Sequence, residues 1–328
     1  MSVWHQAFAR AMRSPVPRAV AALAAMLLIG CLFHNQGAFF EWGTHRAVLR
    51  EIAVTGILAC GMTLAIVSGG IDLSVGSVLA LAAVTSSVLS MHWGWPAGLV
   101  LAATLAVGLA AGAISGALVG HLRVQPFIAT LAMMVFARGL AKIVSGGRKV
   151  APPPVQELGA SVPPSELFAL IDARILGGHL SAVTVVFLAC VAITALVLSR
   201  LRLGRHLYAV GGNFEAARLS GVPARRVVLA AYALSGAFAA LAGICQAGQE
   251  THGDPETGIG YELDAIAMVV IGGTSLAGGR GGVGLTLIGA LTIGYLQKIL
   301  SINAFSTEAR LMLTGIIIVA AVLFQRRR

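Results

Sequence analysis

The sequence has 328 residues, of which 57% are hydrophobic and 11% are charged, and its net charge is +10. Soluble domains contain about 25% charged residues, so this composition excludes an ordinary water-exposed fold and predicts a chain embedded in lipid. The basic residues lie in short segments between apolar runs rather than along one face, which argues against nucleic-acid binding.

Apolar runs of roughly 20 residues are long enough to cross a bilayer as helices. The sequence contains about ten of them, so we expect an all-α, polytopic transmembrane bundle that forms a single domain over residues 1–328. The expected spans are centred on residues 19–34, 51–68, 72–91, 95–120, 126–145, 181–199, 227–247, 263–279, 282–300 and 311–325.

The orientation follows from the loops, because Lys and Arg collect on the cytoplasmic side of membrane proteins. Arginines are concentrated in alternate loops and in the tail Arg326–Arg328, which predicts that both termini are cytoplasmic. The longest inner loop then covers about residues 200–226, and the longest outer loop about residues 146–180. In the outer loop, Ser165 followed by Glu166 is typical of the start of a short helix.

Four glycines, Gly108, Gly112, Gly116 and Gly120, recur at every fourth position of one predicted span. This spacing places them on a single helix face, where the missing side chains let a neighbouring backbone approach closely. We expect tight helix packing at this face, with pore lining as the alternative.

A carboxylate lies between two apolar spans, in the stretch Gly69–Ser77. Because a charge in hydrocarbon is costly, Asp72 must meet water, a cation or hydrogen-bond donors. The Gly69-Gly70 pair is expected to break the helix, so that Asp72 caps the N-terminus of the next one. Direct handling of substrate or protons is the alternative role.

Catalytic and metal-binding patterns are missing from the sequence. It contains no G-x-x-x-x-G-K-[ST] phosphate loop and no H-E-x-x-H motif, and Cys31, Cys60, Cys190 and Cys245 each lie in an apolar stretch. We therefore expect no catalytic residues, no cofactor, no metal site and no disulfide, and we interpret the chain as a transport protein rather than an enzyme.

Three segments together resemble one family, the membrane permeases of bacterial ABC importers for ribose and related monosaccharides. The matching stretches are Gly61–Leu64 running into Gly69–Ser77, Ala209–Asn213 through Leu219–Val222, and Tyr261–Ile266 through Val270–Gly279. The resemblance implies a multi-pass subunit of the bacterial inner membrane that translocates a monosaccharide. It also implies three partners: a cytoplasmic ABC ATPase that hydrolyses ATP, a periplasmic sugar-binding protein, and a second permease copy or a paralogue.

Within the inner loop, Glu215-Ala216-Ala217 followed by Gly221 is similar to the E-A-A-x-x-x-G pattern by which importer permeases dock on their ATPase. Ala217 and Gly221 are four residues apart, so in a helix they would form one strip of small residues. The resemblance thus assigns an ATPase-coupling loop consisting of Gly211, Gly212, Asn213, Glu215, Ala216, Ala217, Arg218 and Gly221.

A translocation path for a neutral sugar needs only weak polar contacts. The candidate residues for this path and the adjoining helix break are Thr63, Ser68, Asp72, Ser74, Ser77 and Asn303. Each of them could equally satisfy a neighbouring backbone group. Two other functions stay open: an importer permease for a branched-chain amino acid or a furanose-type signalling molecule, and a proton-coupled transporter that uses Asp72 or Asp264.

Overall fold

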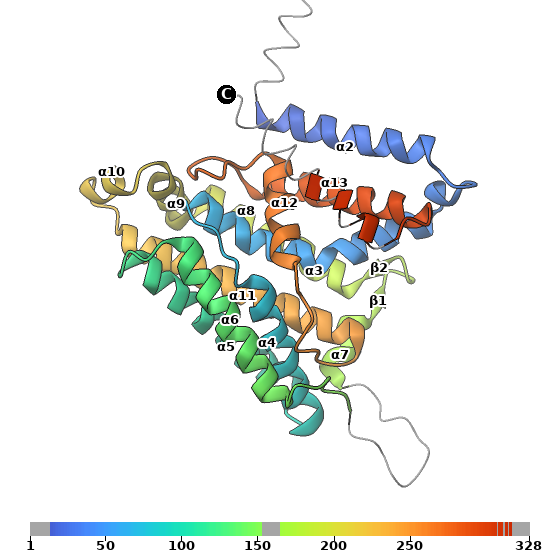
Figure 1. Ribbon diagram of the computed structural model, residues 1–328, viewed down its shortest axis with the longest axis horizontal. Coiled ribbons are helices and arrows are strands. Elements are labelled where there is room, and N and C mark those ends of the chain that lie inside the picture. The colour runs from blue at the N-terminus through green and yellow to red at the C-terminus, as the bar shows by residue number, and fades with distance from the viewer. Residues whose placement is uncertain (1–13, 153–164, 307, 311, 314, 317–328) are drawn as a thin grey trace, which may run out of the picture.

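The computed structural model describes residues 14–152, 165–306, 308–310, 312–313 and 315–316, and it is a bundle of helices (Figure 1). Among these residues, eight helices are long and apolar enough to cross a membrane. The prediction of an all-α polytopic bundle is confirmed. Most of the predicted span at 311–325 lies outside the described residues.

The membrane-length helices follow the predicted apolar runs. They are α2 (Pro15–Leu32), α3 (Trp42–Val67), α4 (Val75–Ser87) with the π-helical turn η2 (Val88–His92), α5 (Ala97–Gly120), α6 (Pro126–Ser145), α8 (Ala182–Arg200), α11 (Ala224–Glu250) and α13 (Val283–Ile302).

Shorter elements join these helices. They are the 3-10 turn η1 (Ala38–Phe40), α7 (Glu166–Asp172), α9 (Arg202–Gly212), α10 (Phe214–Leu219), α12 (Tyr261–Gly272) and the strands β1 (Arg174–Ile175) and β2 (Leu180–Ser181). The strands pair antiparallel, with Arg174 opposite Ser181. The hydroxyl of Ser165 accepts a hydrogen bond from the amide of Phe168, which confirms the predicted capped helix in the outer loop.

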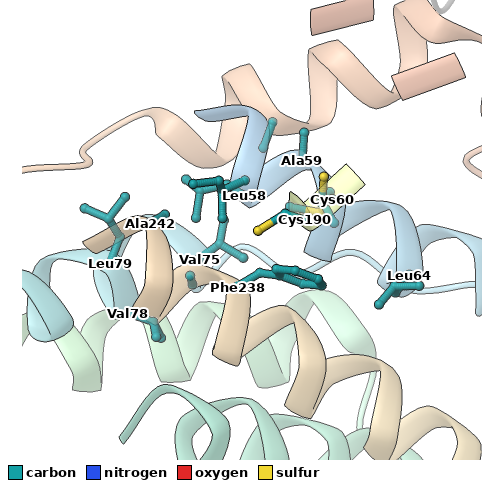
Figure 2. Packing of buried hydrophobic residues seen from close by; sticks show 14 of the residues in the cluster. Leu58, Ala59, Cys60, Leu64, Val75, Val78, Leu79, Cys190, Phe238 and Ala242 are labelled. Carbon is teal, nitrogen blue, oxygen red and sulfur yellow. The ribbon is translucent and has the colours of Figure 1, made fainter. Parts of the chain in front are cut away.

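Helix α11 is central, and it packs against α3, α4 and α5. Figure 2 shows the apolar core where these helices meet α8, with Leu58, Val75, Leu79 and Phe238 among the packed side chains. Cys60, Cys190 and Cys245 are buried as free thiols, and Cys31 is exposed and free. By contrast α2 is mostly exposed, as a helix at the lipid boundary of a bundle would be.

The glycine row on α5 is the contact surface with α11. A Cβ atom added to Gly112 would lie 2.1 Å from the carbonyl oxygen of Tyr232, and one added to Gly108 would lie 2.3 Å from the carbonyl oxygen of Gly236. Side chains at these positions would therefore collide with the backbone of α11. The predicted tight packing at this face is confirmed.

One predicted span is wrong in its form, because the apolar run 263–279 is not a continuous helix. Helix α12 ends at Gly272, where the next residue, Gly273, adopts a left-handed φ of 103°. The chain from α11 to α12 is also non-helical, and it returns along α4, with Gly253 beside Ser87 and Gly258 beside Gly76. An extended segment and a short helix thus replace one span.

Irregular backbone at membrane depth is tolerated only where protein groups satisfy its polar atoms. Arg138 on α6 does this for the segment between α11 and α12. Its guanidinium donates to the carbonyl oxygens of Pro255 at 2.5 Å and Thr257 at 2.8 Å. The ion pairs Lys142–Glu256, at 2.7 Å, and Lys149–Asp254, at 3.1 Å, hold the same segment near the C-terminal end of α6.

The two ends of the bundle differ. Figure 1 shows α9 and α10 at one end and α7 with the β1–β2 hairpin at the other. The end with α9 and α10 carries the basic inner loop of the predicted orientation, including Arg200, Arg202, Arg205 and Arg218. We refer to it as the inner end, and the orientation itself stays a prediction.

The α5–α11 contact predicts opposite effects for two glycine substitutions. Gly112→Ala should lower the free energy of unfolding by about 1–3 kcal/mol, because its Cβ collides with a backbone that cannot yield locally. Gly139→Ala is the matched control on α6, since a Cβ there meets nothing within 4 Å. It should leave stability unchanged or raise it by about 0.5–1 kcal/mol. Unfolding by SDS titration in micelles measures both, and equal values would contradict the packing account.

Candidate functional site

Three glycine pairs from distant parts of the sequence meet at the inner end. They are Gly69-Gly70 after α3, Gly211-Gly212 at the end of α9, and Gly278-Gly279 between α12 and α13. We call this meeting point the glycine junction. Each pair belongs to one of the three stretches on which the family resemblance rests.

The glycine junction is a contact of backbone on backbone. The amide of Gly279 donates to the carbonyl oxygen of Val67 at 3.0 Å. A Cβ atom on Gly211 would lie 1.9 Å from the same oxygen and 2.7 Å from the Gly279 nitrogen, and one on Gly278 would lie 2.8 Å from the Cα of Gly69. No residue with a side chain fits at Gly211 or Gly278 unless the segments separate.

The α3–α4 break beside the glycine junction is organised by Asp72, which is fully buried. One carboxylate oxygen accepts from the amide of Ser74 at 3.0 Å and from its hydroxyl at 2.6 Å. The other accepts from the hydroxyl of Ser235 on α11 at 2.8 Å. The N-cap position of α4 is Ser74 rather than Asp72, so Asp72 supports the helix start from two residues upstream and also joins it to α11.

The remaining path candidates separate into two places. Thr63 and Ser77 are buried close to the break, and the Thr63 hydroxyl lies 2.7 Å from that of Thr286. Ser68 donates to the carbonyl oxygen of Ala65 at 2.8 Å. Asn303 lies at the far end of α13, where its amide donates to the carbonyl oxygens of Phe33, at 2.9 Å, and Ile299, at 2.8 Å. Asn303 is therefore not part of a common site with the other candidates.

A hollow of about 330 Å³ opens between the glycine junction and the inner loop. Ser68 and Gly70 line it from the α3–α4 break, Asn213 and Phe214 from the inner loop, and Tyr232 from α11. Ser68 and Asn213 are the polar side chains that the sequence analysis singled out at this hollow. It connects the predicted coupling loop with the break that contains Asp72.

The inner loop folds as two short helices. Tyr208 on α9 donates to the carbonyl oxygen of Gly281 at 2.9 Å, which fixes α9 to the α12–α13 loop. The side chain of Asn213 accepts from the amide of Ala216 and caps α10. Glu215 accepts from Arg218 at 2.7 Å and pairs with Arg123 at 3.6 Å. The hydrogen bond from Arg218 lowers the pKa of the Glu215 carboxyl below its ordinary value.

The expected strip of small residues does not exist. Ala217 is only 6% exposed, because it packs against the chain's own core. Helix α10 ends at Leu219, and Gly221 follows it with a left-handed φ of 84°. The two residues therefore do not share a helix face. The large apolar side chain that α10 exposes is that of Leu219, at 78% exposure.

The sequence analysis missed three residues of this region. Ser235 and Tyr232 lie on α11, more than 150 positions from the break they contact, and nothing in their local pattern indicates that neighbour. Leu219 has a local signal, because it is a large apolar residue within a basic loop. For metals, the described residues contain no group of three or more His, Cys, Asp or Glu side chains that could hold an ion.

Comparison with known proteins gives the family. A family model described as "Branched-chain amino acid transport system / permease component" matches residues 45–322. The ribose import permease protein of Escherichia coli (strain K12) is 37% identical over 309 residues, which are 93% of this chain and 92% of the relative. No solved structure matches the chain.

Two further relatives from the same strain have sugar transport in their names. The L-arabinose transport system permease protein is 38% identical and covers 92% of this chain and 88% of its own length. The xylose transport system permease protein is 33% identical, with 92% and 89% covered. The predicted resemblance to permeases for ribose and related monosaccharides is confirmed. The chain belongs to the family of multi-pass permease components described as branched-chain amino acid transport system permeases.

Proposed function

We propose that this chain is the membrane-spanning permease subunit of an ATP-driven importer that carries a monosaccharide across the bacterial inner membrane. The observation that carries this proposal is the match over about nine-tenths of the chain to permeases named for ribose, L-arabinose and xylose. The chain supplies the path, and a separate cytoplasmic ATPase hydrolyses ATP. A periplasmic binding protein delivers the sugar, and a second permease copy or a paralogue completes the path.

A branched-chain amino acid is the second candidate substrate, because the matching family model is described by it. The polar groups around the α3–α4 break favour a sugar. The hydroxyl-bearing Ser68 lines the hollow beside the break, whereas the buried carboxylate of Asp72 already accepts three hydrogen bonds from Ser74 and Ser235. A zwitterionic amino acid would require free charged partners in such a buried site.

The inner loop is the proposed docking site for the ATPase. It lies at the inner end, and the exposed side of α10 presents Ala216 and Leu219 next to the charged pair of Glu215 and Arg218. An exposed leucine beside charged side chains suits a protein contact in which an apolar centre is surrounded by a polar rim. Leu219 therefore replaces Ala217 and Gly221 as the expected centre of the docking surface.

The glycine junction connects this proposed docking site mechanically to the membrane-spanning helices. Because α9 contacts both the α3–α4 break and the α12–α13 loop through backbone atoms, a displacement of α9 moves both segments together. We infer that this is how ATP-driven motion of the partner changes the packing of the spans. The chain itself makes and breaks no covalent bond in this mechanism.

The docking proposal is tested by Leu219→Asp, with Leu219→Met as the matched control that keeps an apolar side chain. Leu219→Asp should reduce ATP-dependent sugar uptake to background and weaken co-purification of the ATPase. It should fold normally, because exposed positions change stability little. Leu219→Met should retain both sugar uptake and co-purification of the ATPase. The measurement is uptake into vesicles that contain permease, ATPase and binding protein.

Several outcomes of this assay would contradict the proposal. Normal uptake and normal ATPase retention by Leu219→Asp would make the inner loop a plain connection. ATP-dependent uptake of leucine, with no uptake of ribose, arabinose or xylose, would favour the amino-acid candidate. Uptake that a proton uncoupler stops while ATP is present would indicate a proton-coupled transporter.

The hydrogen bonds of Asp72 predict different effects for two substitutions. Asp72→Asn should assemble and transport, since its amide oxygen still accepts from Ser74, and the Ser235 hydroxyl can accept from the new amide nitrogen. Asp72→Leu should lower the free energy of unfolding by about 1–3 kcal/mol or more, because it leaves the Ser74 amide and the hydroxyls of Ser74 and Ser235 without an acceptor. SDS titration and the same uptake assay measure both variants. A well-assembled Asp72→Asn protein that cannot transport would contradict the structural role.

A further inference from the structure

A pocket of about 160 Å³ at the outer end is lined by basic side chains. Arg46 and Arg50 reach it from the first turns of α3, Arg174 from β1, and His179 from the turn between β1 and β2. Ser181 and Thr184 line it at the start of α8. Neither the coupling loop nor the α3–α4 break takes part in this pocket.

The positive charge of the pocket is only partly compensated. Arg50 pairs with Asp172 at 2.6 Å, and Arg46 donates one hydrogen bond to the carbonyl oxygen of Gly178 at 3.0 Å. The guanidinium of Arg174 has no hydrogen-bond or ion-pair partner within the described part of the chain. Among the described residues, these three guanidinium groups therefore have one carboxylate partner, Asp172, and one carbonyl acceptor, Gly178.

The position of the pocket relative to the membrane follows from the aromatic residue beside it. Trp42 is 63% exposed, and its indole nitrogen lies 3.4 Å from the Nδ1 atom of His179. Exposed tryptophans concentrate at the level of the lipid headgroups in membrane proteins. Trp42 thus places the pocket at headgroup level. The predicted orientation puts it on the outer side of the membrane, where Lys and Arg are normally less frequent than on the cytoplasmic side.

An apolar surface continues from the pocket toward the bilayer centre. On α8, below Thr184, the exposed side chains Val185, Leu188, Ile193 and Leu196 form one stripe at helical spacing. Such a stripe is suited to the acyl chains of a lipid whose headgroup lies in the pocket.

We propose that this pocket binds the phosphate group of an anionic phospholipid, with the acyl chains along the α8 stripe. The guanidinium group is planar and always charged, and it donates paired hydrogen bonds that match the geometry of phosphate oxygens. Arg174 and Arg46 supply these donors, while Arg50 remains paired with Asp172. A bound lipid of this kind fixes the β1–β2 hairpin to the ends of α3 and α8.

The test measures binding of phosphatidylglycerol to the purified full-length chain in detergent by native mass spectrometry. Arg174→Gln should weaken the affinity by about tenfold, since it removes a charge-assisted contact. Arg174→Lys keeps the charge without the fork and should weaken it less. Arg148→Gln is the matched control, because Arg148 is an exposed arginine of the outer loop that does not line this pocket. It should bind like the parent chain.

Two further ligands identify the source of the phosphate. Phosphatidylcholine, whose phosphate charge is offset by its own choline ammonium, should bind more weakly than phosphatidylglycerol and should lose less affinity in Arg174→Gln. Glycerophosphoglycerol, which has the same phosphodiester headgroup without acyl chains, should compete weakly. If it bound as tightly as the lipid, the site would serve a soluble anion and the lipid proposal would be overturned.

Two results would also reject the proposal. One is an affinity for phosphatidylglycerol that is the same in Arg174→Gln and in the parent chain, with both proteins equally stable without lipid. The other is an effect of Arg174→Gln that appears only as weaker binding of the periplasmic protein, with lipid affinity unchanged. That result would make the pocket a protein contact.

Discussion

Contact between backbones at the glycine junction is the constraint on which the inner end depends. The oxygen of Val67 is close enough to Gly211 that no Cβ fits between them, and it also accepts the amide of Gly279. Three segments that are separated by many residues in sequence are thereby held at fixed distances. The inner loop, the Asp72 break and the α12–α13 loop are positioned by this contact, and the hollow between them follows from it.

The lipid solvent explains why small residues recur throughout this bundle. Lipid tails are as apolar as leucine, so helices gain little by burying large apolar side chains and associate instead by close packing and internal hydrogen bonds. The row from Gly108 to Gly120 lets α5 approach α11, and Ser235 on the same helix reaches Asp72. Arg138 supplies an internal hydrogen bond of the same kind to the irregular segment before α12. Its guanidinium replaces the donors that water would provide outside the membrane.

The sequence predicts the membrane-length helices well, because hydropathy and helix length are local properties. It also predicts the α5 glycine face and the capped start of α7. The end of α12 is not predicted correctly, because the expected span 263–279 runs past the Gly272-Gly273 pair, where a Cβ on Gly272 would collide with the backbone of Leu285 on α13. The same limit explains the error at Ala217. A small residue in a helical loop has the same local pattern whether it is exposed or, as here, packed against the core.

The sequence identifies the three glycine motifs but does not predict that they contact one another, because contacts between distant segments leave no local pattern. Gly211 and Gly212 allow the most direct test, since they are neighbours with opposite surroundings. A Cβ on Gly211 collides with Val67, whereas one on Gly212 meets nothing within 4 Å. We predict that Gly211→Ala lowers the free energy of unfolding, measured by SDS titration, by about 3 kcal/mol. Gly212→Ala should stay within about 0.5 kcal/mol of the parent chain, and equal stability of the two variants would contradict the glycine junction.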